Sequence, residues 1–121
     1  MADDRANLGR RGEKLARSYL KNLGYRIIAH NYRCPAGELD ILALDGDVIV
    51  FVEVKTRRSE DAADVQDAVN PTKRRQLERV ARYYLAGTPA ARRHRCRFDI
   101  IGIVWGDGDP LIRHIRNAFG A

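Results

Sequence analysis

The chain has 121 residues, of which 45% are hydrophobic and 31% charged. This length supports one hydrophobic core, so we expect a single domain over residues 1–121. No apolar run approaches the length of a membrane span, and the N-terminus lacks the pattern of a signal peptide. We therefore expect neither a membrane-spanning nor a secreted protein, and we expect a cytoplasmic location. Cys34 and Cys96 are too few and too far apart to define a zinc site or a disulfide framework, and we assign them no role.

The charge is strongly basic, with 22 Lys and Arg residues against 16 Asp and Glu residues and a formal net charge of +6. Such an excess favours a polyanionic partner, although net charge also serves solubility. Any one basic group could be an ordinary solvated surface, but several groups together favour nucleic acid. The candidate nucleic-acid-binding residues are Arg10, Arg11, Arg57, Arg58, Lys73, Arg74 and Arg75, and a fourth basic group covers residues 92–95.

The first predicted element is a helix over residues 6–23, where apolar residues recur at spacings of three and four. Gly24 is a suitable end for this helix. Glu13 lies beside the apolar stripe. From its helix position alone, it would be a surface residue that pairs with Arg17 one turn further along.

Residues 25–33 form the next predicted element, a strand that leads into a hairpin. Strict alternation would place Ile27 and Ala29 on one face and Ile28 and His30 on the other. A lone histidine on a strand has no partner that would indicate a metal ligand, so we expect a structural role for His30.

A hairpin follows, because residues 39–44 and 48–54 are apolar runs rich in β-branched residues. The dipeptide Asp45-Gly46 between them is a strong signal for a two-residue turn. If these two residues form the loop, Asp40 lies directly opposite Phe51, and directly opposed residues share a face.

The face with Asp40 then also carries Glu53 and Lys55, because side chains alternate along a strand. Carboxylates at the end of a covered strand lose hydration, which is costly unless they pair or bind a cation. One interpretation is an ion pair in which Lys55 neutralises one carboxylate and leaves the other charge over. The alternative is a divalent metal site, with Mg²⁺ on the carboxylates and Lys55 facing a phosphate or a water. Such a site could hydrolyse phosphodiester bonds.

The remaining chain is predicted to hold one helix and two strands. Residues 59–67 are polar and acidic, and we expect a loop or short helix there. Asn70-Pro71 is a typical helix start, and Gly87 a typical end. Residues 98–105 and 111–115 are the last predicted strands. This order predicts an α/β sandwich with a central mixed sheet of about five strands and helices packed on its faces.

Asp40, followed after twelve residues by Glu53-Val54-Lys55, resembles the D-x(n)-E-x-K core of the PD-(D/E)XK nuclease superfamily, with Leu39 in place of the usual proline. The segments 37–41 and 51–57, together with Arg10-Arg11-Gly12-Glu13, are similar to archaeal Holliday-junction resolvases. From about Gly9 to Phe119, the chain more closely resembles the YraN family of small bacterial proteins.

This resemblance implies a restriction-endonuclease-like, three-layer sandwich. It also implies that Asp40 and Glu53 bind Mg²⁺ or Mn²⁺ together with the backbone carbonyl of Val54. Lys55 would orient the attacking water and stabilise developing charge, and Glu13 would hold a water or a second metal.

We therefore predict a metal-dependent endonuclease that acts on double-stranded or branched DNA. One domain offers one site, and symmetric cutting of two strands needs two sites, so we expect a homodimer. The first alternative is a nucleic-acid-binding or accessory module that keeps the fold with little or no cleavage. The second is an ion-paired scaffold for a protein partner, which would respond neither to metal nor to salt.

Overall fold

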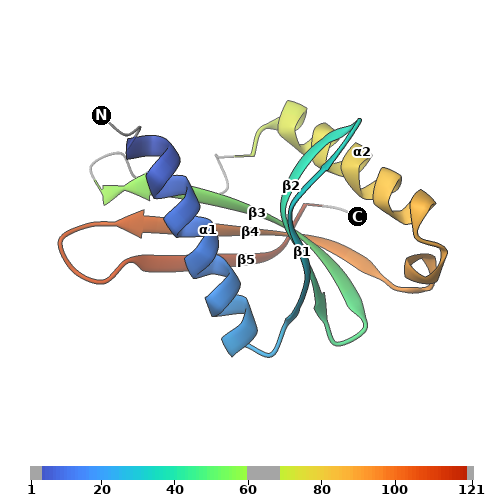
Figure 1. The fold of residues 1–121 in the computed structure, drawn as a ribbon, viewed down its shortest axis with the longest axis horizontal. Coiled ribbons are helices and arrows are strands. Elements are labelled where there is room, and N and C mark those ends of the chain that lie inside the picture. Colours follow the sequence, from blue (N-terminus) through green and yellow to red (C-terminus); the bar gives the residue numbers. More distant parts are fainter. Residues whose placement is uncertain (1–3, 60–68, 120–121) are drawn as a thin grey trace.

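The computed structural model describes residues 4–59 and 69–119. The elements in chain order are α1 (Asp4–Asn22), β1 (Arg26–Cys34), β2 (Gly37–Asp45), β3 (Val48–Arg58), α2 (Pro71–Gly87), the short 3-10 helix η3 (Pro89–Arg93), β4 (Cys96–Trp105) and β5 (Leu111–Phe119). The strands form one five-stranded sheet in the order β1-β2-β3-β4-β5 (Figure 1). Neighbouring strands are antiparallel except β3 and β4, which are parallel because the chain crosses over through α2 between them.

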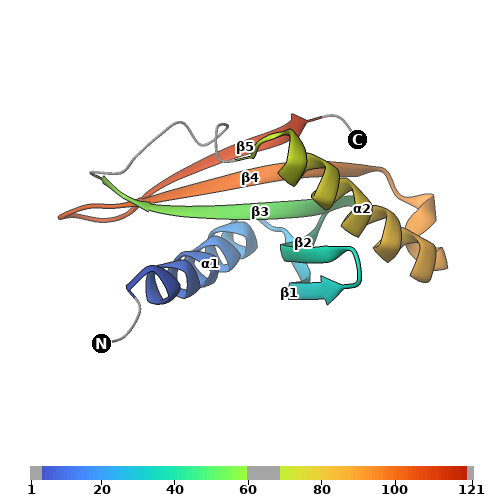
Figure 2. The ribbon, with the colours of Figure 1, turned by 90° about the horizontal axis from the view of Figure 1, so that it is seen from above.

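The two long helices cover opposite faces of the sheet (Figure 2). The central strand β3 is buried on both faces. Val50 and Val52 pack in one core with Ala16 and Leu20 of α1, while Phe51 packs in the other core with α2. The predicted α/β sandwich, a mixed sheet with helices on both faces, is confirmed.

Both helices end close to where their local signals predict. α1 stops before Gly24, whose φ of 95° is one that glycine adopts at little cost. α2 begins at Pro71, and the side chain of Asn70 caps it by accepting a hydrogen bond from the backbone N–H of Lys73 at 2.9 Å. In the described part of the chain, neither helix has the length and apolar character needed to cross a membrane.

The β2–β3 hairpin differs in register from the prediction. Its loop begins one residue later, at Gly46-Asp47. Gly46 has a φ of 62°, the positive value that a type II′ turn requires at its first loop position. The predicted pairing of Asp40 with Phe51 is therefore wrong, because Phe51 pairs with Leu42. This correction moves each cross-strand partner by two residues, so every side chain stays on its predicted face.

β1 contains a bulge that breaks the predicted alternation. Ile27 pairs with Ala43 and Ala29 pairs with Leu42, so Ile28 is an extra residue in the ladder. Ile27 packs against the α1 core and Ala29 against the α2 core. The prediction that Ile27 and Ala29 share a face is wrong, and Ile28 is left 41% exposed.

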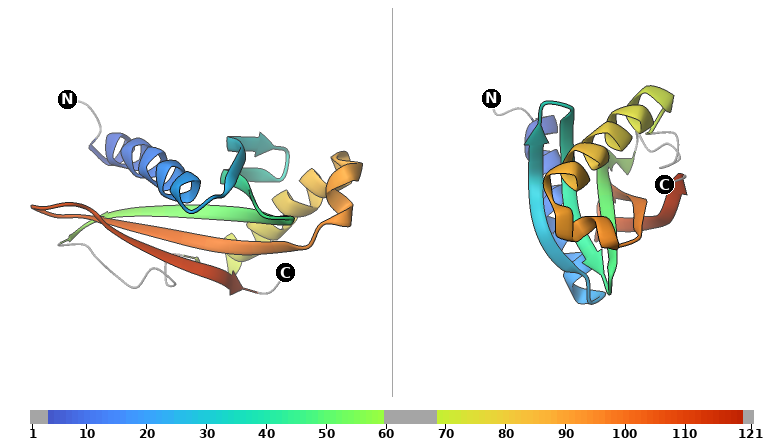
Figure 3. Two further views of the ribbon diagram at one scale, coloured as in Figure 1. Left: turned by 90° about the horizontal axis from the view of Figure 1, so that it is seen from below. Right: turned by 90° about the vertical axis from the view of Figure 1, so that its right-hand side faces the viewer.

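Four strands, β2 to β5, are longer than predicted, and the difference is greatest for β3 and β5. β5 continues to Phe119, beyond the predicted range of residues 111–115. β3 continues to Arg58, but its pairing with β2 covers only Val48–Val52. Residues 53–58 therefore extend past the β1–β2 hairpin and run alongside α1 (Figure 3). The loop or short helix predicted for residues 59–67 lies, from residue 60 onwards, outside the described residues.

Candidate functional site

Asp40 and Glu53 meet where β2 and β3 separate. The β2–β3 ladder ends at the pair of Ile41 and Val52, and Asp40 and Glu53 are the next residues outward. Asp40 Oδ2 accepts a hydrogen bond from the backbone N–H of Val54 at 2.7 Å. The Asp40 and Glu53 carboxyl groups lie close enough for the charge and hydrogen bonding of Asp40 to raise the pKa of Glu53. The structure thus brings together the two carboxylates that the hairpin pattern indicated.

Glu53 is 9% exposed, and this burial dominates its electrostatics. Burial, followed by the nearby charge of Asp40 and the hydrogen bond between the two groups, raises the pKa of Glu53 to about 8. The charge of Lys73 and its hydrogen bond to Glu53 lower the pKa of Glu53, but by less than burial and Asp40 raise it. Two neighbouring carboxylates with one ammonium group leave a net negative charge that favours a proton or a further cation.

The cation that pairs with Glu53 comes from α2. Lys73 Nζ lies 3.2 Å from Glu53 Oε2, in the first turn of α2, whose start is set by the Asn70 cap. The interpretation in which Lys55 neutralises Glu53 is therefore corrected, because that position is taken by Lys73. Lys55 instead contributes to the wall of the adjacent cleft.

Glu13 reaches the site because α1 lies very close to β3. A Cβ atom on Gly12 would overlap the side-chain hydroxyl of Thr56, so glycine permits this approach. Burial and then the charge of Asp40 raise the pKa of Glu13, while Arg17 lowers it. The pKa of Glu13 is therefore affected both by Arg17, its predicted neighbour on the helix, and by Asp40 of the carboxylate site. No three Asp, Glu, His or Cys side chains within residues 4–59 and 69–119 are placed to hold a metal ion together.

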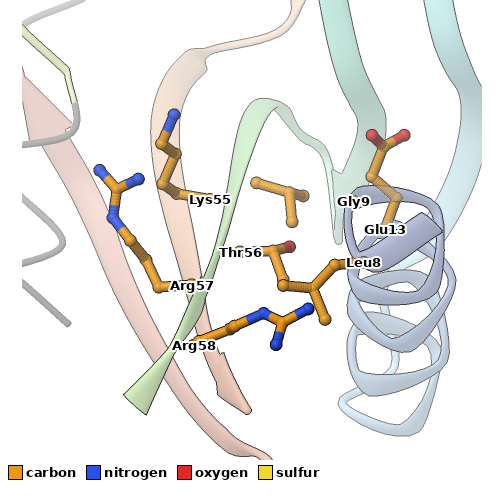
Figure 4. A pocket seen from close by; sticks show the side chains of 8 residues that line it. Leu8, Gly9, Glu13, Lys55, Thr56, Arg57 and Arg58 are labelled. Carbon is orange, nitrogen blue, oxygen red and sulfur yellow. The ribbon is translucent and has the colours of Figure 1, made fainter. Parts of the chain in front are cut away.

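A cleft of about 540 Å³ opens beside this site, between α1 and the extended end of β3 (Figure 4). Glu13 lies on the α1 side, whereas three cationic side chains come from β3. The lining residues are Leu8, Gly9, Glu13, Val54, Lys55, Thr56, Arg57 and Arg58.

Comparison with known proteins places these features in a family. Residues 12–103 match the model of "Uncharacterised protein family UPF0102". The chain belongs to the UPF0102 family. A UPF0102 protein of Geobacter sulfurreducens is 49% identical over 113 residues, which cover 93% of this chain and 88% of that protein. Relatives from Thermodesulfovibrio yellowstonii and Moorella thermoacetica are 44% and 42% identical, and the matches cover 95% and 100% of this chain and 97% and 99% of those proteins.

The predicted nucleic-acid-binding residues of the UPF0102 chain are divided between the site and the surface around it. Arg57 and Arg58 line the cleft, and Lys73 reaches Glu53. The others lie outside these contacts. Arg11 lies over the Trp105 ring at 4.6 Å, Arg74 lies over the Phe119 ring at 4.9 Å, Arg75 Nη2 donates to Thr72 Oγ1 at 3.5 Å, and Arg10 is exposed on α1.

The UPF0102 chain has a second buried polar cluster, centred on Asp99. Its Oδ1 accepts hydrogen bonds from Arg97 and from the backbone N–H of Asn117, and its Oδ2 accepts from His114 and Arg97. Burial alone would raise the pKa of Asp99, but the hydrogen bonds from His114 and Arg97 hold it below its ordinary value. Because both oxygens are occupied by donors of the same chain, Asp99 joins β4 to β5 and is not part of the candidate site.

Sequence reasoning missed two contacts that shape the site. One is the ion pair between Lys73 and Glu53. The other is the packing of the Gln76 amide of α2 against Gly37, where a Cβ atom would overlap Gln76 and φ is 141°. The only local signal for the first was the Asn70 cap, which fixes where the first turn of α2 begins.

Proposed function

We propose that this protein is a metal-dependent endonuclease that hydrolyses phosphodiester bonds in DNA. The observation that carries the proposal is the proximity of Asp40 and Glu53 beside a cleft lined by Val54, Lys55, Arg57 and Arg58. Buried neighbouring carboxylates need a cation, and a cationic cleft attracts a phosphodiester backbone. Nuclease chemistry uses both features at one place.

The donor set suits a hard divalent cation. Asp40 and Glu53 offer carboxylate oxygens, and Val54 at the cleft offers a backbone carbonyl. Mg²⁺ in proteins commonly uses one or two carboxylates and completes its shell with waters and substrate phosphates. The raised pKa of Glu53, caused first by burial and then by Asp40, supports this fit, since a buried carboxyl that holds a proton can exchange it for a metal ion.

A divalent cation in such a site polarises a phosphoryl oxygen and lowers the pKa of a bound water. The side chains of the protein do the rest. The Lys55 ammonium donates to the phosphate oxygens, where negative charge grows as water attacks phosphorus and the bond to the leaving oxygen breaks. Glu13 would hold a water by hydrogen bonding. The attacking water would release its proton to solvent, and the leaving oxygen would take a proton from solvent.

The direct test is incubation of the purified protein with labelled linear, flapped and four-way DNA in Mg²⁺, Mn²⁺ or EDTA. We expect cleavage with either metal, none in EDTA, and none with Asp40→Asn or Glu53→Gln. Lys55→Met should slow cleavage by about 100-fold while DNA binding persists. Glu38→Gln is a matched control, because Glu38 pairs with Arg33 at 3.0 Å on the exposed hairpin. Cleavage that survives loss of either carboxylate would assign the activity elsewhere.

Metal binding has a separate readout that needs no turnover. Mg²⁺ that binds only the folded chain should raise the thermal midpoint of the wild type, with about 2.7 kcal/mol of added stability at a metal concentration of 100 times Kd. Glu53→Gln should remove this rise. A wild-type thermal midpoint that is the same with and without Mg²⁺ or Mn²⁺ would contradict the metal site.

A second candidate function is a nucleic-acid-binding accessory module. The ion pair between Lys73 and Glu53 favours it, because it already neutralises one carboxylate without a metal. This candidate predicts salt-sensitive DNA binding with no cleavage in either metal. A scaffold for a protein partner predicts neither salt-sensitive DNA binding nor cleavage.

The active form is proposed to be a homodimer, since each chain carries one such site and symmetric cutting of two strands needs two. Light scattering with and without four-way DNA measures the oligomeric state directly. A monomer on DNA that nicks one strand would retain the hydrolysis and remove the dimer from the proposal.

A further inference from the structure

Gly9 and Gly12 both lie inside α1, but they differ in what surrounds them. Glycine is the least favourable residue for a helix interior apart from proline. Gly12 has a packing reason, because a Cβ atom there would overlap Thr56. No such reason is found for Gly9, because within residues 4–59 and 69–119 no heavy atom beyond its own helix backbone and chain neighbours lies within 4 Å of where its Cβ would be. Its open side belongs to the cleft.

The cleft beside Gly9 is flanked by cations on both sides of one strand. Figure 4 shows the Arg58 side chain extending from β3 toward α1, while Lys55 and Arg57 extend from the opposite face of β3. A ligand that crosses the edge of β3 at this point would have positive charge on either side and the bare helix surface at Gly9 beside it.

Among the described residues, no strand pairs with this edge of β3 beyond Val52. β2 pairs with β3 only as far as Val52, and the backbone N–H of Val54 is directed toward the hairpin, where Asp40 accepts it. Backbone groups alternate in direction along a strand, so the N–H of Thr56, a residue that lines the cleft, points toward the same edge of β3. An open strand edge of this kind offers hydrogen-bond donors as well as nearby charge.

We propose that one polynucleotide strand crosses the edge of β3 in this cleft, with its sugar-phosphate backbone in contact with α1 at Gly9. The inference rests on the proposed function, because it positions the strand that the carboxylate site would cut. Phosphates face Arg58, Lys55 and Arg57, and an uncharged sugar lies on the helix where Gly9 carries no side chain.

The size and charge of the cleft favour this occupant. A volume of about 540 Å³ is that of a small-ligand site, which suits a short piece of one strand and not the width of a duplex. A polynucleotide carries one negative charge per nucleotide, about 3.4 Å apart along a strand in duplex form, so it can meet several cations in succession. An acidic peptide could satisfy the same charges, and the experiment below separates the two.

The test uses the full chain with Gly9→Ala and Gly9→Gln. Ser18→Gln is the control, since Ser18 is exposed on α1 and does not line the cleft. We expect Gly9→Ala to raise the thermal midpoint by about 4 °C, because alanine is the better helix former. In EDTA, the Kd for a labelled single-stranded oligonucleotide, measured by anisotropy, should rise about threefold for Gly9→Ala and about tenfold or more for Gly9→Gln. Ser18→Gln should leave Kd unchanged.

In Gly9→Ala the thermal midpoint thus rises while the affinity for the oligonucleotide falls. Loss of folding would lower both, so it cannot explain this result. Wild-type affinity in both Gly9 variants would overturn the inference and leave the proposed hydrolysis intact, since cleavage is measured separately. A wild-type chain that neither binds nor cleaves DNA would overturn both. Polyglutamate that displaces the oligonucleotide as well as unlabelled DNA of equal charge would overturn the assignment of the cleft to a polynucleotide.

Discussion

Replacing Glu53 with glutamine should stabilise this protein at alkaline pH. Glu53 is buried beside Asp40, and its pKa is raised from the ordinary value of 4.5 to about 8, first by burial and then by Asp40. At about 1.4 kcal/mol per pH unit, a shift of this size corresponds to up to about 5 kcal/mol. Glutamine has the same shape without the charge. It can donate to Asp40 and accept from Lys73.

The direction follows from proton linkage. A carboxyl group whose pKa is higher in the folded chain than in the unfolded chain contributes stability while it is protonated. For Glu53, that contribution is fully present below pH 4.5 and is lost as the pH rises through about 8. The free energy of unfolding of Glu53→Gln, minus that of the wild type, should therefore be smallest near pH 4.5 and should grow by up to about 5 kcal/mol above pH 8.

Urea unfolding of both proteins at about pH 5, 7 and 9 measures this difference. Every other titratable group is present in both proteins, so its contribution to the difference cancels. Glu38→Gln, on the exposed hairpin, should show no comparable pH dependence. A difference between Glu53→Gln and wild type that is constant with pH would refute the reasoning, as would a variant that is less stable than wild type at pH 9.

Three further predictions concern other parts of the fold. Gly12→Ala should lower the free energy of unfolding by about 1–3 kcal/mol, because its Cβ overlaps Thr56, and unchanged urea unfolding would contradict the close approach of α1 to β3. Asp99→Asn should cost about 3–5 kcal/mol at neutral pH, because it removes the carboxylate that bonds Arg97 and His114 inside the protein. Since the pKa of Asp99 is lowered, this cost should shrink as the pH falls below its ordinary 3.8, and a cost independent of pH would argue against the ion pairs. Replacing Arg57 and Arg58 together by alanine should flatten the salt dependence of DNA binding by up to about two units, whereas an unchanged slope would remove both from the interface.

Local features of the sequence determined the elements and one essential part of the site. Asn70 and Pro71 mark the start of α2, because a cap needs only the residues beside it. Asp40 and Glu53 could be assigned to one face from alternation alone. That assignment survived a wrong turn position, since the error moved each partner by two residues and side chains repeat with a period of two.

Only the tertiary structure shows which cation pairs with Glu53 and how closely α1 approaches the site that Glu53 forms with Asp40. Lys73 pairs with Glu53 because α2 packs across the sheet, and nothing near either residue in the sequence records that contact. The approach of Gly12 to Thr56 and the bonds from His114 to Asp99 likewise join segments far apart in the chain. The bulge at Ile28 also depends on which core each neighbour enters. Such contacts follow from how whole elements pack, whereas propensity and periodicity record only what lies within one element.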